Sequence, residues 1–125
     1  MEVNPEPIAD KECALLVLSS CPDSHSADAL ATALVKEKLA ACVNQLPGVQ
    51  SIYEWQGQLQ RDCEVLLLIK TTAQIWPTLR DRIQAIHPYD VPELIALPIE
   101  AGSQPYLQWL RENSRAQGDF DQVDC

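Results

Sequence analysis

Two short apolar runs set the strongest constraint on how this chain can fold. Residues 12–20 read E-C-A-L-L-V-L-S-S, and residues 65–69 read V-L-L-L-I. Runs of this length with little polar alternation are typical of strands buried in the centre of a sheet. Such strands need neighbours on each side and a layer packed over them. The rest of the chain must therefore supply edge strands and helices.

Two segments between the predicted strands show helical periodicity. In residues 26–39, apolar side chains recur every three or four positions after Asp23 and Ser24, either of which can cap a helix. The same spacing recurs in residues 72–86. A third, short helix with several aromatic and leucine side chains is expected from about residue 103. These helices are the layer that the central strands require.

The remaining apolar segments carry prolines, which are typical of sheet edges because proline cannot donate a hydrogen bond to a neighbouring strand. Residues 40–59 are interrupted by a Pro-Gly pair, which predicts a bulge in an edge strand. A glycine-containing turn at 56–58 predicts a hairpin that leads into the return strand 60–72. Residues 93–100 also contain a proline and are predicted to form the strand at the other edge.

The predicted order is therefore β-α-β-β-α-β plus a terminal helix, which is an α+β fold. Right-handed crossovers place both helices on one face of the four-stranded sheet. No segment remains to cover the other face, so we expect an oligomer that buries it. We expect one domain over residues 12–114, a flexible lead over 1–11 and an acidic flexible tail over 115–125.

Charge and hydropathy exclude several classes of function. The 125 residues include 9 Lys plus Arg and 18 Asp plus Glu, for a net charge of −9, which disfavours nucleic-acid binding. No window of about 18 apolar residues is present, so no membrane span is predicted. The acidic start has no apolar segment typical of a signal peptide, which predicts a cytoplasmic protein. No nucleotide-binding, zinc-protease or Ser-His-Asp motif is present, so we predict that the chain is not an enzyme.

The cysteines are widely spaced and odd in number, and they stand at positions 13, 21, 42, 63 and 125. This pattern predicts neither a disulfide framework nor a zinc site. We expect buried, reduced thiols at Cys13, Cys42 and Cys63, which lie in strand-like runs.

The stretch Ile86 to Leu94, I-H-P-Y-D-V-P-E-L, joins the second helix to the fourth strand. Its two prolines fix the backbone and push His87 and Val91 towards extended geometry. A connector this stiff holds its side chains in fixed directions, which suits a binding loop. The alternative is a structural turn in which His87 caps the end of the helix.

Other polar and aromatic side chains are candidates for a ligand cleft between subunits. They are Lys70, Tyr53, Trp55, Tyr89, Glu93, Tyr106 and Trp109. For the lysine, the alternative is a surface ion pair with a carboxylate. For the aromatic residues of the hairpin and the terminal helix, it is packing at a subunit interface.

Five blocks of sequence resemble the CutA family of divalent-cation tolerance proteins. They are L-A-A-C-V-N at 39–44, P-G-V-Q-S-I-Y-E-W-Q-G at 47–57, E-V-L-L-L-I-K-T-T at 64–72, H-P-Y-D-V-P-E-L at 87–94 and Y-L-Q-W-L at 106–110. The resemblance spans roughly residues 14–111. It implies a ferredoxin-like fold and a tight homotrimer similar to that of the PII signalling proteins.

The resemblance also implies where a metal would bind, and the chain departs from the family there. Metal-binding members carry a thiol and a histidine at the positions of Ser19 and Ile86. The retained candidate ligands are His87, Cys21 and Glu64, which predict a weak site for Cu(II) or another divalent cation. No other cofactor is predicted.

We therefore expect a cytoplasmic, homotrimeric protein of divalent-cation, and specifically copper, tolerance or response that binds a metal ion or acts in signalling. One alternative is a PII-like trimer that binds a small anionic metabolite near Lys70 and His87. Another is a trimeric structural anchor that holds a partner protein through its acidic tail.

Overall fold

Residues 13–115 are described by the computed structural model, and within them four strands and three helices alternate along the chain. The elements are β1 (Ala14–Cys21), α1 (Ser24–Lys36), β2 (Cys42–Trp55), β3 (Gln58–Thr72), α2 (Trp76–Ile86), β4 (Ile95–Pro98) and α3 (Gln104–Glu112). The predicted lead (1–11) and residues 116–125 of the predicted tail lie outside the described residues.

The strands form one sheet in the order β2-β3-β1-β4, and each neighbouring pair is antiparallel. The two apolar runs, β1 and β3, occupy the centre, and the proline-containing strands β2 and β4 form the edges. This topology confirms the predicted α+β, ferredoxin-like βαββαβ sandwich with an extra C-terminal helix.

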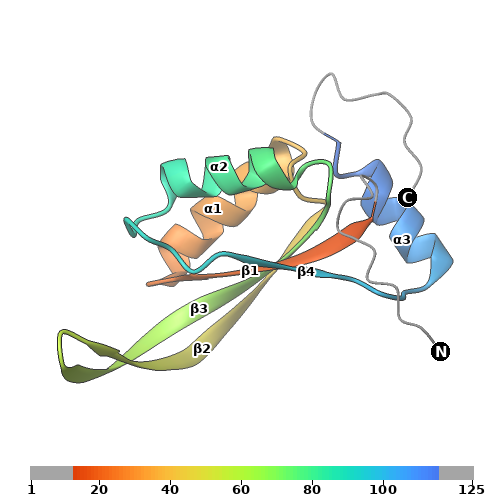
Figure 1. The fold of residues 1–125 in the computed structure, drawn as a ribbon. Coiled ribbons are helices and arrows are strands. Elements are labelled where there is room, and N and C mark those ends of the chain that lie inside the picture. The colour runs from red at the N-terminus through yellow and green to blue at the C-terminus, as the bar shows by residue number, and fades with distance from the viewer. Residues whose placement is uncertain (1–12, 116–125) are drawn as a thin grey trace.

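Both long helices lie on the same face of the sheet, and α3 lies beside one end of it (Figure 1). Under α1 and α2, alternate residues of the central strands, among them Leu15, Val17, Leu67 and Ile69, are fully buried. Burying each such side chain contributes roughly 1.5–3 kcal/mol. We call this side of the sheet the covered face. Neither α1 nor α2 lies over the opposite side, which we call the open face. Within residues 13–115, α3 packs against it only at one end, where Leu110 is buried with Ala14.

Several predicted helix and strand boundaries differ from the structure by two to four residues. Helix α2 begins at Trp76 rather than at residue 72, because Thr72 still pairs with Ala14 in the sheet. Strand β4 covers only four residues rather than 93–100. Helix α1 begins at Ser24, where the side chain of Asp23 accepts a 2.8 Å hydrogen bond from the backbone N–H of Ser26.

The predicted bulge and hairpin are both present in the long β2–β3 ribbon. The pairing register shifts between Leu46 and Val49, and Gly48 takes a φ of 78° there. The turn has two residues, Gln56 and Gly57, with φ of 52° and 78°. This left-handed pair is the geometry that continues the right-handed twist of the ribbon.

The predicted reduced state is confirmed at Cys42 and Cys63 but is wrong at Cys13, and the predicted burial is wrong at Cys42 and Cys63. Cys13 is disulfide-bonded. Cys42 is only half-buried, because it points to the open face with its partner Lys70. Cys63 is exposed, because it lies beyond the part of β3 that pairs with β1. None of the helices formed within residues 13–115 is long and apolar enough to cross a membrane.

Candidate functional site

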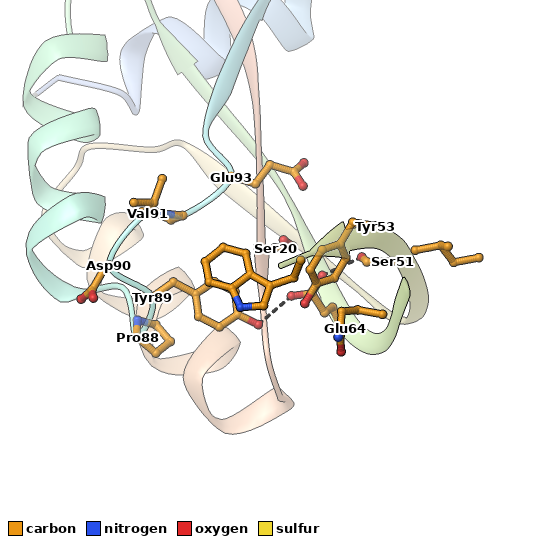
Figure 2. A pocket seen from close by; sticks show the side chains of 13 residues that line it. Ser20, Ser51, Tyr53, Glu64, Pro88, Tyr89, Asp90, Val91 and Glu93 are labelled. Atoms are coloured by element: carbon orange, nitrogen blue, oxygen red, sulfur yellow. Dashed lines mark hydrogen bonds between the residues drawn. The ribbon is translucent and has the colours of Figure 1, made fainter. Parts of the chain in front are cut away.

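A groove of about 1210 Å³ lies on the open face, between the β2–β3 ribbon and the loop after α2. The residues that line it are Ser20, Ser51, Ile52, Tyr53, Trp55, Gln60, Glu64, Pro88, Tyr89, Asp90, Val91, Pro92 and Glu93. Figure 2 shows the loop residues on one side and the ribbon residues on the other. The proline-stiffened loop that the sequence singled out is thus one wall of a groove.

His87 anchors that loop to the end of β1. Its backbone is extended, as expected before Pro88, and its N–H donates to the carbonyl of Ile83 at 2.8 Å, which ends the helix. Its ring Nε2 lies 2.8 Å from the carbonyl oxygen of Ser20, and its Nδ1 accepts a 3.0 Å hydrogen bond from the N–H of Tyr89. Because a carbonyl only accepts and an N–H only donates, the ring is neutral with its proton on Nε2. Both ring nitrogens are therefore engaged in holding the loop.

Glu64 is the buried carboxylate of the groove, with only 7% of its surface exposed. The hydroxyl of Ser51 donates to Oε1 at 2.6 Å, and the hydroxyl of Tyr89 donates to Oε2 at 2.7 Å. The second of these bonds crosses from the loop to the ribbon (Figure 2). Burial and the bond to Glu64 raise the pKa of Tyr89 well above its ordinary value, so its hydroxyl keeps the proton that it donates.

The three predicted metal ligands are only partly brought together. Cys21 Sγ lies 3.8 Å from His87 Nε2. Glu64, however, points to the open face, because its neighbour Val65 is the residue that pairs with Cys21 on the covered face. Within residues 13–115 no group of three His, Cys, Asp or Glu side chains is arranged to hold a metal ion.

The protonation of this pair also disfavours a metal ion. Burial is the main reason that the pKa of the Cys21 thiol is raised to about 11, so the thiol is protonated at neutral pH. A metal would have to displace that proton and break the bond from His87 Nε2 to the Ser20 carbonyl. As arranged, these residues do not fit a tight metal site.

The predicted cleft residues fall into two groups. Tyr53, Trp55, Tyr89 and Glu93 line the groove. The other three, Lys70, Tyr106 and Trp109, lie elsewhere in the single chain. The chain thus gathers four of the seven residues in one place.

Lys70 stands six residues beyond Glu64 on the same strand, which is a separation of about 20 Å. Its ammonium contacts the amide oxygen of Asn44 and lies 4.0 Å from Cys42 Sγ. Tyr106 and Trp109 stack on each other on α3, with ring centroids 5.7 Å apart. None of these three residues, Lys70, Tyr106 and Trp109, lines the groove.

Sequence reasoning missed Ser20, Ser51, Ile52 and Gln60 as lining residues. The period-two alternation of the ribbon was a usable signal, because Ser51 must share a face with Tyr53 in the same strand. The position of Ser20 in the lining depends on how the loop docks against β1, and that docking has no local signal.

The matching family model, the curated relatives and the solved structures named here all carry the same family name. The family model described as "CutA1 divalent ion tolerance protein" matches residues 15–113. The divalent-cation tolerance protein CutA of Thermus thermophilus is 54% identical over 99 residues, which cover 79% of this chain and 96% of that protein. Protein CutA of Homo sapiens is 47% identical over 100 residues, which cover 80% of this chain but only 56% of the human protein.

Solved structures agree with the sequence matches. CutA1 from Oryza sativa superposes with a TM-score of 0.81 at 42% identity, and the match covers 85% of this chain and 97% of that one. The divalent cation tolerance protein from Thermus thermophilus superposes with a TM-score of 0.78 at 52% identity, covering 81% and 98%. The chain therefore belongs to the CutA1 divalent ion tolerance protein family.

Proposed function

We propose that this chain acts in divalent-cation tolerance as a homotrimer that binds copper weakly. The general function follows from the names of its relatives, which include the divalent-cation tolerance protein CutA of Thermus thermophilus. The trimeric state, the copper ion and a cytoplasmic location are the specific parts of the proposal. Relatives described as chloroplastic and periplasmic make the location a separate question from the function.

The apolar side chains of the open face support the proposed homotrimer. Its central rows are leucines and isoleucine that are only half-buried or exposed in the single chain, namely Leu16, Leu18, Leu46, Leu66, Leu68, Ile95 and Leu97. An apolar patch on this scale marks an interaction surface. A second and third copy of the chain would remove it from water.

The observation that carries the copper part is the 3.8 Å separation of Cys21 Sγ and His87 Nε2. A thiolate and an imidazole are ligands that suit copper. The affinity is weak because binding must displace the thiol proton and the bond to Ser20, and because Glu64 lies on the other face. Binding strengthens as pH rises towards the Cys21 pKa of about 11, by up to about tenfold per pH unit.

Calorimetric titration of Cu(II) into wild type, His87→Ala, Cys21→Ala and Cys42→Ala tests this site. We expect weaker binding for the first two variants. Cys42→Ala should bind as wild type does, since Cys42 pairs with Lys70, about 17 Å along β3 from the Val65 that pairs with Cys21. If wild type and His87→Ala bind copper equally weakly, no copper site exists at His87.

The rival anionic metabolite is disfavoured by the charge of the groove. Its lining includes the carboxylates of Glu64, Asp90 and Glu93 and no Lys or Arg. Lys70, which the anion would need, lies about 20 Å along the strand from Glu64. The anchor hypothesis depends on the acidic tail, which falls almost wholly outside the described residues, and it stays a prediction.

We also propose that the chain catalyses no reaction. His87, its most reactive side chain, has both ring nitrogens committed to holding the loop.

A further inference from the structure

The open face presents a buried negative charge at one end that nothing in the described chain neutralises. Glu64 lies in the groove with 7% of its surface exposed, and each of its oxygens accepts a hydrogen bond from a hydroxyl group. Neither ion pair found within residues 13–115 involves this carboxylate. An ionised carboxylate has about four lone-pair sites, so both oxygens still have room for a further donor. Its burial without a counter-charge favours a basic side chain from outside the chain.

Lys70 supplies a positive charge at the other end of the same face, about 20 Å along β3. Side chains at positions 64, 66, 68 and 70 share this face, because those between them are buried under the helices. The ammonium of Lys70 contacts the neutral amide of Asn44, and no carboxylate of the described part of the chain forms an ion pair with it. The chain thus holds an unpaired carboxylate and an unpaired ammonium on one face, too far apart to meet.

The symmetry of a trimer favours a contact between these two different ends. A ring of three copies has to be heterologous, which means that one patch of each chain binds a different patch of the next chain. The two ends of the open face are different patches of this kind, and their charges attract each other across a contact between copies. A contact of either end with the same end of another copy would instead bring like charges together.

Exposed aromatic side chains accompany both ends. Tyr53 and Trp55 lie on the ribbon wall of the groove, and Tyr106 and Trp109 lie on α3. Helix α3 packs at the end of the sheet that carries Lys70. Tyrosine and tryptophan are enriched in protein–protein interfaces. Both ends of the open face are therefore suited to contact protein rather than water.

Building on the homotrimer proposed above, we propose that Lys70 of each copy enters the groove of the next copy and neutralises Glu64 there. The ring forms this ion pair three times. The aromatic side chains of α3 lie against the ribbon aromatics of the neighbouring copy and exclude water from the pair. The groove is thus a socket for a second copy of this chain, and the ion pair fixes which ends of the copies meet.

A double-mutant cycle of Glu64→Gln and Lys70→Met tests the ion pair. Both substitutions remove a charge and keep most of the side-chain volume, so the fold of the single chain is preserved. Sedimentation of a dilution series, at one urea concentration that partly dissociates wild type, gives the trimer dissociation constant. Each single variant leaves a buried charge unpaired and should raise this constant at least about 30-fold. The double variant should dissociate no more readily than the weaker of the two single variants.

Such a result identifies a contact between copies, because effects at two positions about 20 Å apart in one chain add. Glu93→Gln is the matched control, since Glu93 also lines the groove but is exposed. Its effect should be small and should add to that of Lys70→Met. Lys70→Glu, which leaves the groove untouched, should sediment as a single chain with unchanged helical circular dichroism, because it brings two carboxylates together between copies.

The outcomes separate the ion pair from the trimer itself. If wild type sediments as a single chain, the homotrimer is wrong and the ion pair is wrong with it. If wild type is a trimer but the effects of Glu64→Gln and Lys70→Met add, or if Lys70→Glu still forms trimers, only the ion pair is overturned. Coupling of Lys70→Met to Glu93→Gln instead of to Glu64→Gln would also overturn it.

Discussion

The two faces of the sheet differ although the same strands supply both. Leu67 is fully buried under the helices, whereas Leu66 and Leu68, its neighbours on β3, point to the open face and are only half-buried. The strand has leucine at all three positions, so hydropathy alone does not separate the faces. The half-buried leucines support the proposed oligomer, in which further copies of the chain would cover the open face. The groove lies at the polar end of that face.

The largest expected effect comes from placing a charge on each face in turn. Leu67→Asp puts a carboxylate into the covered core, where its desolvation exceeds the stability of a typical domain, and we expect no folded protein. Leu66→Asp puts the same charge on the open face. We expect this variant to keep its helical circular dichroism but to sediment as a single chain.

Wild type in the same experiment should sediment at three times the mass of one chain. Leu66→Asp that remains trimeric would show that the open face is not the subunit interface. Loss of structure in both variants would mean that the chain cannot fold unless both faces are covered, and the two faces would then be equivalent.

Much of this architecture could be predicted from the sequence. The apolar runs gave the central strands, the prolines gave the edges, and the Gly57 turn gave the hairpin, because each is a local pattern with a local cause. The predicted start of α2 was wrong. Thr72 has a side chain that suits a helix cap, but pairing with β1 extends strand β3 through this residue. A tertiary contact overrode a local preference.

The candidate site was less predictable. The ribbon aromatics and the loop were identified, but Glu64 and Cys21 were assigned to one metal site although strand alternation places them on opposite faces. That separation follows from the pairing of Cys21 with Val65, which the sequence does not state. The tautomer of His87 likewise depends on the Ser20 carbonyl, which is brought close only by the packing of the loop.

Tyr89→Phe is the next largest perturbation and acts at the polar end of the open face. It removes the hydroxyl that donates to Glu64 Oε2 and leaves a buried carboxylate with one donor fewer. We expect unfolding free energy to fall by about 1–3 kcal/mol, measured by urea denaturation at fixed protein concentration.

Tyr106→Phe provides the comparison, because the Tyr106 hydroxyl makes no hydrogen bond within the described chain and its ring only stacks on Trp109. Equal stability of the two variants would mean that solvent replaces the Tyr89 hydroxyl. The hydrogen bond from Tyr89 to Glu64 would then add nothing to the stability of the folded protein.

The smallest expected effect lies on the covered face, at a buried serine. The hydroxyl of Ser19 is fully buried and has no hydrogen-bond partner among residues 13–115, and Leu67 is its strand neighbour. Ser19→Ala removes the unsatisfied group and adds no volume, so we expect unfolding free energy to rise by about 1 kcal/mol.

Ser114→Ala tests the reason for this gain, since Ser114 is equally buried but donates to the Leu110 carbonyl at 2.7 Å. This second variant should lose stability, by about 1 kcal/mol, in the same urea titration. A gain of stability in Ser19→Ala and a loss in Ser114→Ala would show that the effect depends on whether the serine hydroxyl has a hydrogen-bond partner. A loss of stability in Ser19→Ala would mean that the hydroxyl has a partner in the assembled protein, and the covered face would then be as complete in its polar contacts as in its apolar ones.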